Sequence, residues 1–357
     1  MFLSFSCDRS YIMPDCLGVT EHRLGDYCVD VFNDGCLLEG SSCDYSEAYF
    51  KSNKLRPSEW SKKIVLIADT SVYANQCLMY SWLNSSYLVG DALNCNPRNC
   101  PTDHPHNILS NPSASGSYTS FAEGIIFQSR GFRVYGHWLL DYLPRLLLIK
   151  EYCKSFPDLP IIVRNIPQWA KVFIYRLGIT NPIVNIPEGG EFRIALLHIP
   201  LIMKEGSAYF EPLLAESFFT IRQLFASFNS LDKSAFPKKI FFARRKPPFA
   251  LNQDEAIDFY TKRGFHCVYP ELLSLEEQIS MFSCCRAFVG EDSSAMHNIG
   301  FAAGSSSLIF SRMNRINLWH AAVASATGQY IRPVQSKILA RDGKYQIALD
   351  DELLVGL

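Results

Sequence analysis

The sequence lacks an excess of charge of either sign. Its 357 residues include 34 Lys and Arg against 35 Asp and Glu, and the formal net charge is −1. Proteins that bind nucleic acid usually carry a clear excess of basic residues. We therefore expect no nucleic-acid partner, and any anion-binding site has to be a local cluster of positive charge.

Long hydrophobic runs are also missing. A helix that spans a bilayer needs about 20 apolar residues, and the closest segment, residues 138–149, is interrupted by Asp141, Pro144 and Arg145. The N-terminal residues have neither the basic start nor the apolar length of a signal peptide. These absences predict a soluble, cytoplasmic protein with no transmembrane segment, and they leave open a peripheral contact at the inner face of the membrane.

Patterns typical of metal and disulfide sites are absent as well. The 12 cysteines include no C-x-x-C pair, and Cys28, Cys267, Cys284 and Cys285 lie in apolar patterns typical of reduced core cysteines. No D-x-D pair is present that could hold a nucleotide-bound metal. We expect neither a disulfide framework nor a metal cofactor.

Several motifs of common enzyme classes are missing too. No glycine-rich dinucleotide motif, Walker motif, G-x-S-x-G or H-E-x-x-H sequence occurs. A dehydrogenase needs the first of these after one of its strands, so this class is disfavoured.

The sequence does contain an alternation of strand and helix patterns. It runs over residues 124–230 and again over 240–330, which predicts two α/β units. We expect a first domain over residues 1–230, with an irregular N-terminal region, and a second, Rossmann-like domain over 231–330. The tail, residues 331–357, is expected to pack back on the first domain.

Local signals add detail to the first domain. Residues 27–38 have the pattern of a hairpin, and residues 94–120 are rich in Asn, Pro, Ser and Gly, which predicts a loop. A helical pattern covers residues 135–148, where Pro144 should kink the helix or start a second one.

The second domain has the clearer pattern. Capping boxes are predicted at Asn252 with Glu255 and at Ser274 with Glu277, and Gly264 should end the first helix. The expected strands are 240–243, 265–269, 287–289 and 307–310, and the expected helices are 252–263, 275–284 and one that starts at Ser293.

Three cations, Arg244, Arg245 and Lys246, directly follow the strand at 240–243. Guanidinium groups bind phosphate oxygens well, and ligands of doubly wound sheets bind at the carboxyl ends of the strands. The alternative is a basic turn exposed to solvent. A second feature at the same edge favours the phosphate site.

That second feature is the stretch Gly290–Asn298. Gly290 gives the strand before it a permissive exit, and Ser293 is predicted to cap a helix that Gly304 ends. The N–H groups at such a helix start bind phosphates. The alternative is an ordinary strand–helix junction, since all junctions of this class have the same geometry.

Other polar residues form smaller groups. His137 and Asp141 are one helical turn apart, and they form either an oriented base or a packed structural pair that Arg145 continues. His297 and His320 are interpreted as structural. Near the second junction Glu271, Glu277 and Gln278 could contact a ribose, although capping alone accounts for Glu277.

Three stretches together resemble the family 61 glycosyltransferases, in the order and spacing of that family. The group includes plant xylosyl- and arabinosyltransferases, animal O-linked N-acetylglucosaminyltransferases and bacterial proteins of capsule and exopolysaccharide synthesis, which this chain resembles. The stretches are Gly136–Leu146, Ile240–Arg245 with Asn252–Glu255, and Tyr269–Phe282 running into Gly290–Asn298.

The resemblance implies a GT-B fold, with two Rossmann-like domains facing a cleft and the donor, expected to be a UDP-sugar, on the second. It also implies inverting, metal-independent transfer to a hydroxyl of a glycan or glycolipid acceptor. Carried over by position, it implies cleft-lining roles for Asp141, the first candidate base, and His137, the alternative. Donor-binding roles follow for Arg244, Glu271, Gln278 and Asn298, and the local patterns add Arg245, Asp292, Ser293 and Ser294.

The chain departs from the family at two motifs. Many members have an additional Arg shortly before the Asn–Glu stretch, where this chain has Phe249-Ala250-Leu251. Asp292-Ser293-Ser294 stand where many members have His-Gly-Ala. An alternative function is therefore a catalytically silent subunit that binds a nucleotide or a sugar within a polysaccharide assembly complex.

Overall fold

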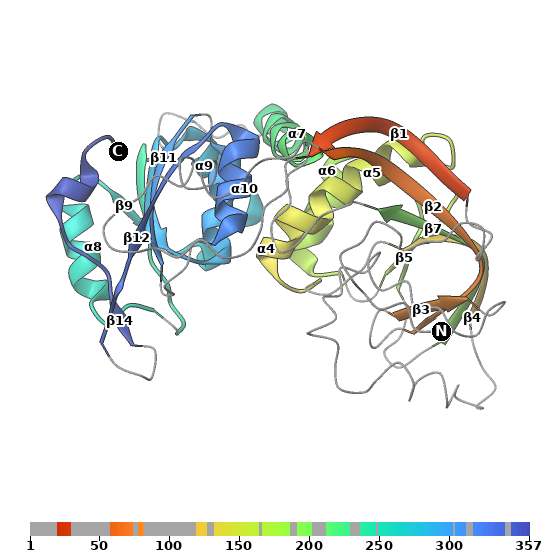
Figure 1. Ribbon diagram of the computed structural model, residues 1–357, viewed down its shortest axis with the longest axis horizontal. Helices are drawn as coiled ribbons and strands as arrows, with labels where there is room; N and C mark the ends of the chain where they lie inside the picture. The colour runs from red at the N-terminus through yellow and green to blue at the C-terminus, as the bar shows by residue number, and fades with distance from the viewer. Residues whose placement is uncertain are drawn as a thin grey trace. The chain divides into compact units, whose positions relative to one another are not determined.

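The computed structural model describes the following residues of the chain (Figure 1): 20–29, 58–73, 78–81, 119–126, 132–163, 166–185, 191–201, 212–228, 236–247, 249–302, 304–311, 317–339 and 344–357. The chain divides into two compact units, with residues 1–27 and 60–203 in the first and residues 28–59 and 204–357 in the second. The predicted hairpin at 27–38 and the predicted loop at 94–120 lie largely outside the described residues.

The first unit contains a mixed seven-stranded sheet in the order β1-β2-β7-β4-β5-β6, with β3 paired to β2. The pairs β7–β4, β4–β5 and β5–β6 are parallel, whereas β2 pairs antiparallel with both β7 and β3. The parallel half has the predicted strand–helix alternation, and the antiparallel half departs from a wholly parallel Rossmann-like sheet. The strands are β1 (Thr20–Val29), β2 (Ser58–Tyr73), β3 (Leu78–Ser81), β4 (Thr119–Ile126), β5 (Ile161–Val163), β6 (Ile183–Asn185) and β7 (Glu191–Leu201).

The helices of the first unit include one irregular turn. Pro144 lies in the first turn of α5, as one of the two predicted outcomes, and a π-helical segment η4 comes directly before it. Proline has no N–H to donate, so the helix has to restart around it. The helices are α4 (Tyr135–His137), η4 (Trp138–Tyr142), α5 (Leu143–Cys153), η5 (Gln168–Ala170) and α6 (Lys171–Arg176).

The second unit contains a parallel sheet in the order β12-β11-β10-β8-β9. The chain passes from β8 outward to β9 and then returns across β8 to β10, so the direction of winding reverses between β8 and β10. This is the predicted doubly wound sheet, with an additional strand β12 that the sequence patterns did not indicate. The strands are β8 (Lys239–Phe242), β9 (His266–Val268), β10 (Ala287–Glu291), β11 (Ser306–Ser311) and β12 (Tyr330–Gln335), and a separate hairpin joins β13 (Lys337–Ile338) to β14 (Tyr345–Gln346).

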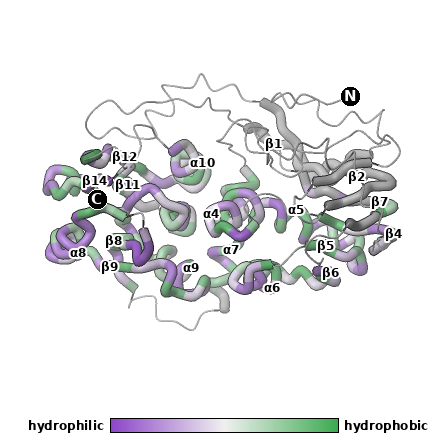
Figure 2. Tube along the Cα trace, turned by 90° about the horizontal axis from the view of Figure 1, so that it is seen from below, coloured by the Kyte–Doolittle hydropathy of each residue, from purple (hydrophilic) through white to green (hydrophobic). Residues whose placement is uncertain are grey.

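Helices cover both faces of this sheet: α8 lies on one face, and α9 and α10 lie on the other (Figure 1). Helix α8 is largely hydrophilic (Figure 2) and buries one side, with Gln253, Ala256 and Tyr260 buried. The helices are α7 (Pro212–Phe228), α8 (Gln253–Thr261), η7 (Pro270–Leu272), α9 (Leu275–Cys284), η8 (Ser294–Phe301), α10 (Leu318–Thr327) and η9 (Asp351–Leu354).

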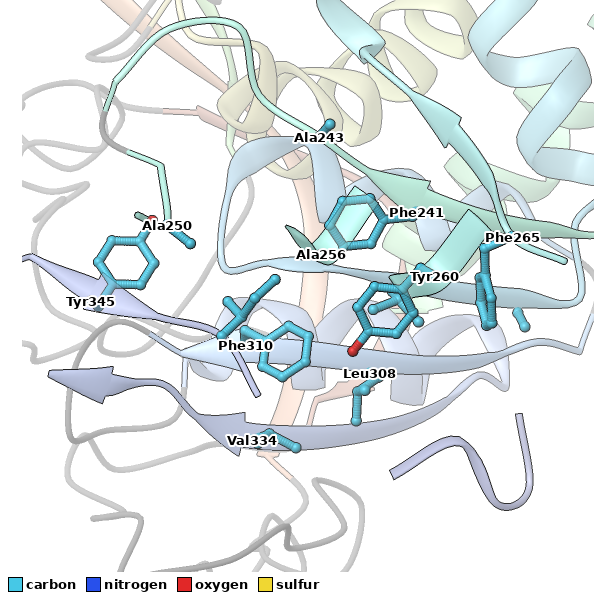
Figure 3. Close-up of a cluster of buried hydrophobic side chains, with 13 residues drawn as sticks. Phe241, Ala243, Ala250, Ala256, Tyr260, Phe265, Leu308, Phe310, Val334 and Tyr345 are labelled. Atoms are coloured by element: carbon cyan, nitrogen blue, oxygen red, sulfur yellow. The ribbon is translucent and has the colours of Figure 1, made fainter. Parts of the chain in front are cut away.

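Two expectations about domain membership differ from the structure. Helix α7, expected in the first domain, groups with the second unit because Phe218 packs on Phe301, with 4.9 Å between ring centroids. The tail, expected on the first domain, packs instead on the second unit over its described residues, 331–339 and 344–357. Tyr345 and Ile347 join the hydrophobic cluster between the sheet and α8 (Figure 3).

One of the two predicted capping boxes is present. Ser274 accepts from the backbone N–H of Glu277, and the Glu277 carboxylate accepts from the N–H of Ser274. Asn252 makes no side-chain cap. Its amide is buried and bonds the backbone of Ile347 instead, at 2.9 and 3.0 Å. A partner 95 positions away in the sequence therefore replaces the local cap.

Candidate functional site

The carboxyl ends of β8 and β10 form one edge of the second sheet. The two strands are parallel neighbours, with Phe242 opposite Gly290, so the residues that follow them leave the sheet together. These residues are Arg244 and Arg245 after β8, and Asp292, Ser293 and Ser294 after β10. The reversal of winding lies between these strands, which is where doubly wound sheets bind ligands. The structure thus brings five of the predicted donor residues to one edge.

Hydrogen bonds hold the backbone of Arg244, whereas one nitrogen of its guanidinium has no partner among the described residues. The side-chain amide of Gln253 accepts from the N–H of Arg244 at 2.8 Å and donates to its carbonyl oxygen at 3.0 Å. The Arg244 Nη1 atom is buried and has no hydrogen-bond partner among the described residues. A buried cationic donor without a partner is costly, so this atom favours an anionic ligand.

Arg245 and Glu271 connect two neighbouring loops. The N–H of Arg245 donates to Glu271 Oε1 at 2.7 Å, which ties the loop after β8 to η7 after β9. Both side chains are exposed at this point. The proposed contact of Glu271 with a ribose stays a prediction, and the structure adds a role in holding the loop.

Gln278 and Asn298 lie behind the edge rather than on it. The Gln278 amide donates to the carbonyl oxygens of Pro270 and Leu273 at 3.0 and 3.2 Å, and it accepts from Asn298 Nδ2 at 3.3 Å. Both side chains are buried, and Asn298 is 0% exposed. The predicted donor contacts of both residues stay predictions, and the structure adds a role for both as supports that join η7, α9 and η8.

The stretch after β10 differs from the expected strand–exit–helix pattern. Gly290 is still within the strand, and its role is space: a Cβ there would lie 2.9 Å from Phe242 Cβ and 3.0 Å from Met296 Sδ. Ser293 precedes a 3₁₀-helix, η8, and makes no side-chain cap. The N–H of Met296 already bonds the carbonyl oxygen of Ser293 at 3.0 Å. The N–H groups suited to an anion at this helix start are therefore those of Ser294 and Ala295, which precede the first bond of the helix.

Asp292 joins two histidines that the sequence patterns left separate. Its Oδ1 accepts from His320 Nε2 and from Asn317 Nδ2, both at 2.8 Å, and His320 Nδ1 lies 3.1 Å from His297 Nδ1. Burial raises the pKa of Asp292, but the hydrogen bonds from His320 and Asn317 and the charge of the histidines outweigh it and hold this pKa well below its ordinary value. Asp292 is therefore an ionised carboxylate that connects η8 and α10.

This network gives a test by pH. A depressed pKa in the folded state means that the ionised carboxylate stabilises the fold above the unfolded pKa of about 3.9, and that this stability is lost as the pH falls further. We expect Asp292→Asn to lower the free energy of unfolding at pH 7 by about 1.5–3 kcal/mol, the net contribution of a hydrogen bond to a charged group. Urea unfolding from pH 7 to pH 3 should show the difference from wild type shrinking below about pH 4. The exposed Asp158→Asn is the control, and a difference that is constant with pH would contradict the role of the charge.

In the first unit, His137 and Asp141 form a close pair in the irregular helix. His137 Nδ1 lies 2.6 Å from Asp141 Oδ2, where Asp141 is 6% exposed and His137 is 26% exposed. The Nδ1 side of the His137 ring is thus bound to a buried carboxylate, and His137 is the more exposed side chain of the pair. The sequence made Asp141 the first candidate base and His137 the alternative. The burial of Asp141 favours His137 as the base, with Asp141 orienting its ring.

The π-helical segment η4 sets this pair in place. Trp138 is fully buried, and its indole N–H donates to the carbonyl oxygen of Phe132 at 2.5 Å. Its ring packs against Tyr142, with 5.0 Å between centroids, and stacks on Phe173 at 6.4 Å. Short π-helical segments are frequent at functional sites, and this one lies beside His137 and includes Asp141.

Residues 135–309 match the model of the family described as Glycosyltransferase 61. On this match the protein is a glycosyltransferase. The matched range starts at α4 and ends within β11, so this glycosyltransferase region includes both the His137–Asp141 pair and the edge formed by β8 and β10. The match supports the resemblance read from the sequence motifs, while the bacterial capsular type stays a prediction. The comparison with curated proteins found no relative.

Several residues that build the glycosyltransferase site were not indicated by the sequence. Gln253 holds Arg244, and His320 and Asn317 hold Asp292. Gln253 lies within the Asn252–Glu255 stretch of the resemblance and His320 was interpreted as structural, but no sequence pattern paired any of the three with its partner. Their partners are 9 to 28 positions away, so only the folded chain brings them together.

Across the ranges that the structure describes, no helix combines the length and the apolar character that a bilayer crossing requires.

Proposed function

We propose that the protein is an inverting, metal-independent glycosyltransferase. It transfers a sugar from a nucleoside-diphosphate sugar, expected to be a UDP-sugar, to a hydroxyl of a glycan or glycolipid acceptor in polysaccharide synthesis. The single observation that carries the donor class is the buried Nη1 of Arg244, which has no hydrogen-bond partner in the described part of the chain and lies where the winding of the second sheet reverses.

The second unit is proposed to hold the donor. A leaving nucleoside diphosphate gains negative charge as the bond to the sugar breaks, and preorganised donors stabilise that charge best. The Arg244 guanidinium and the N–H groups at the start of η8 supply such donors. The Gln253 amide bonds the backbone of Arg244 and so helps to fix the position of this residue. Fixed cations and N–H groups thus stabilise the charge of the leaving diphosphate, which a divalent ion does in other transferases.

The first unit is proposed to supply the base. His137, held through Nδ1 by Asp141, takes the proton from the acceptor hydroxyl on its other ring nitrogen. The acceptor oxygen forms a bond to the anomeric carbon from the face opposite the diphosphate, and the carbon–oxygen bond to the diphosphate breaks. This in-line displacement inverts the anomeric configuration. On this proposal the two units are the two domains of a GT-B enzyme.

Asp292 favours a second candidate, a silent binding subunit. An ionised carboxylate at the same edge adds negative charge where the phosphates of the donor would bind. A subunit that binds a sugar or a nucleotide without turnover would tolerate this charge. A simple assay distinguishes the two candidates, because only the enzyme releases nucleoside diphosphate from a nucleotide sugar.

The proposal is tested by thermal unfolding of the protein with UDP, GDP, ADP and CDP. A ligand at about 100 times its Kd stabilises the folded state by about 2.7 kcal/mol, so one nucleotide of the panel should raise the melting temperature clearly. The same nucleotide, linked to a panel of sugars, should be released over time by the protein with acceptor. Binding without release would favour the silent subunit. No shift with any nucleotide would refute the transferase and the nucleotide-binding form of the silent subunit.

A further inference from the structure

Glu291, the last residue of β10, is a buried carboxylate with partners from two distant segments. Its Oε1 accepts from the backbone N–H of Ala250 at 3.0 Å, and its Oε2 accepts from the hydroxyl of Tyr345. Glu291 is 3% exposed and Tyr345 is 2% exposed. Each bond is therefore made away from water, where losing one partner leaves a costly unsatisfied charge.

The same region of the tail bonds the end of the loop that carries Arg244. The N–H of Leu251 donates to the carbonyl oxygen of Tyr345 at 2.9 Å, and the side chain of Asn252 bonds both backbone groups of Ile347. Figure 3 shows Ala250 and Tyr345 together in the hydrophobic cluster. The turn Ala250–Asn252 is thus held between β10 and the segment around β14.

This turn leads directly to the residue that holds Arg244. Gln253 follows Asn252 in the chain, and its amide makes both bonds to the backbone of Arg244. The order of contacts is Tyr345 to Glu291 and the turn, then to Gln253, then to Arg244. A change at Tyr345 can therefore shift the guanidinium without touching it.

We infer that Tyr345 is a positioning residue of the donor site, which acts through Glu291 and the turn at Ala250–Asn252 to fix Arg244. The inference rests on the proposed donor site. It gives the C-terminal segment a role in binding the diphosphate of the donor, in addition to covering the hydrophobic cluster.

The test uses the full chain, with UDP or the nucleoside diphosphate of the panel that stabilises it most. Tyr345→Phe keeps the backbone bonds and removes only the hydroxyl, so the Kd should rise about tenfold, the effect of one weakened hydrogen bond to a charged group. Tyr330→Phe, which removes the hydroxyl of an exposed tyrosine in β12, is the matched control and should bind like wild type. Binding is measured by calorimetry well below the melting temperature of both variants, where a loss of stability alone leaves the Kd unchanged.

A double-mutant cycle with Arg244→Lys separates positioning from an independent effect. Lysine keeps the charge but loses the fork, so binding stays measurable. If Tyr345 acts through Arg244, adding Tyr345→Phe to Arg244→Lys should change the Kd much less than it does in wild type. Fully additive effects, or a Tyr345→Phe protein that binds like wild type, would overturn the inference while leaving the donor site in place. A wild-type protein that binds no nucleoside diphosphate would instead overturn the proposed function, and this inference with it.

Discussion

Arg244→Ala is expected to lower the rate of sugar transfer by about 10²–10³-fold, the usual cost of removing one preorganised donor that stabilises charge in the transition state. The fold should stay intact, because the Gln253 amide bonds the backbone of residue 244 and not its side chain. Removing a buried nitrogen that has no partner among the described residues also removes a cost rather than a contact. The rate is measured as nucleoside diphosphate released with acceptor present.

The matched control for Arg244 is Lys246→Ala, an exposed cation two positions further along the same loop. It should transfer sugar at close to the wild-type rate, since an exposed charge is screened by solvent. Equal losses in the two variants would mean that the loop contributes only a diffuse positive field. Wild-type turnover in Arg244→Ala would remove Arg244 from the mechanism.

His137→Ala should reduce turnover by about 10²–10⁴-fold, the contribution of a general base, while the Kd for the nucleoside diphosphate stays unchanged. The donor residues belong to the second unit, so removing the imidazole leaves their contacts in place. Asp141→Asn should also lower turnover severely at unaltered donor affinity, because the amide no longer fixes the ring as the carboxylate does. The double variant should be little worse than His137→Ala, as expected of two residues that act as one unit.

Added imidazole separates a base from a packing role. It should restore part of the turnover of His137→Ala and none of the turnover of Asp141→Asn. The exposed His266→Ala, in β9, is the control and should behave like wild type. If Asp141 were the base, as the sequence first indicated, His137→Ala would keep most of its activity and Asp141→Asn would lose it.

The elements of the second unit were predictable because their signals are local. The helix α9 starts and ends where the capping box at Ser274 and the apolar spacing place it, and Gly264 ends the preceding helix with a φ of 80°. Strands β8, β10 and β11 contain apolar runs between turn residues, which is the pattern of a parallel strand buried on both faces. From these elements the edge that carries Arg244 and Ser293 follows directly.

The contacts that the sequence did not predict share a different cause. Asn252 satisfies the rule for a helix cap, yet its amide bonds Ile347, which no local rule can indicate. His320 and Asp292 are 28 positions apart and meet only after β11 and α10 are in place. Which of His137 and Asp141 is the base depends on which side chain is buried. Helical spacing places both on the same face and does not distinguish them.

The most direct test of the central claim is a crystal structure of the protein with the nucleoside diphosphate that stabilises it most. We predict that the diphosphate lies at the edge formed by β8 and β10, with its oxygens in hydrogen-bond reach of the Arg244 guanidinium and of the N–H groups at the start of η8. A diphosphate bound anywhere else on the chain, with Arg244 Nη1 still unpartnered, would contradict the account.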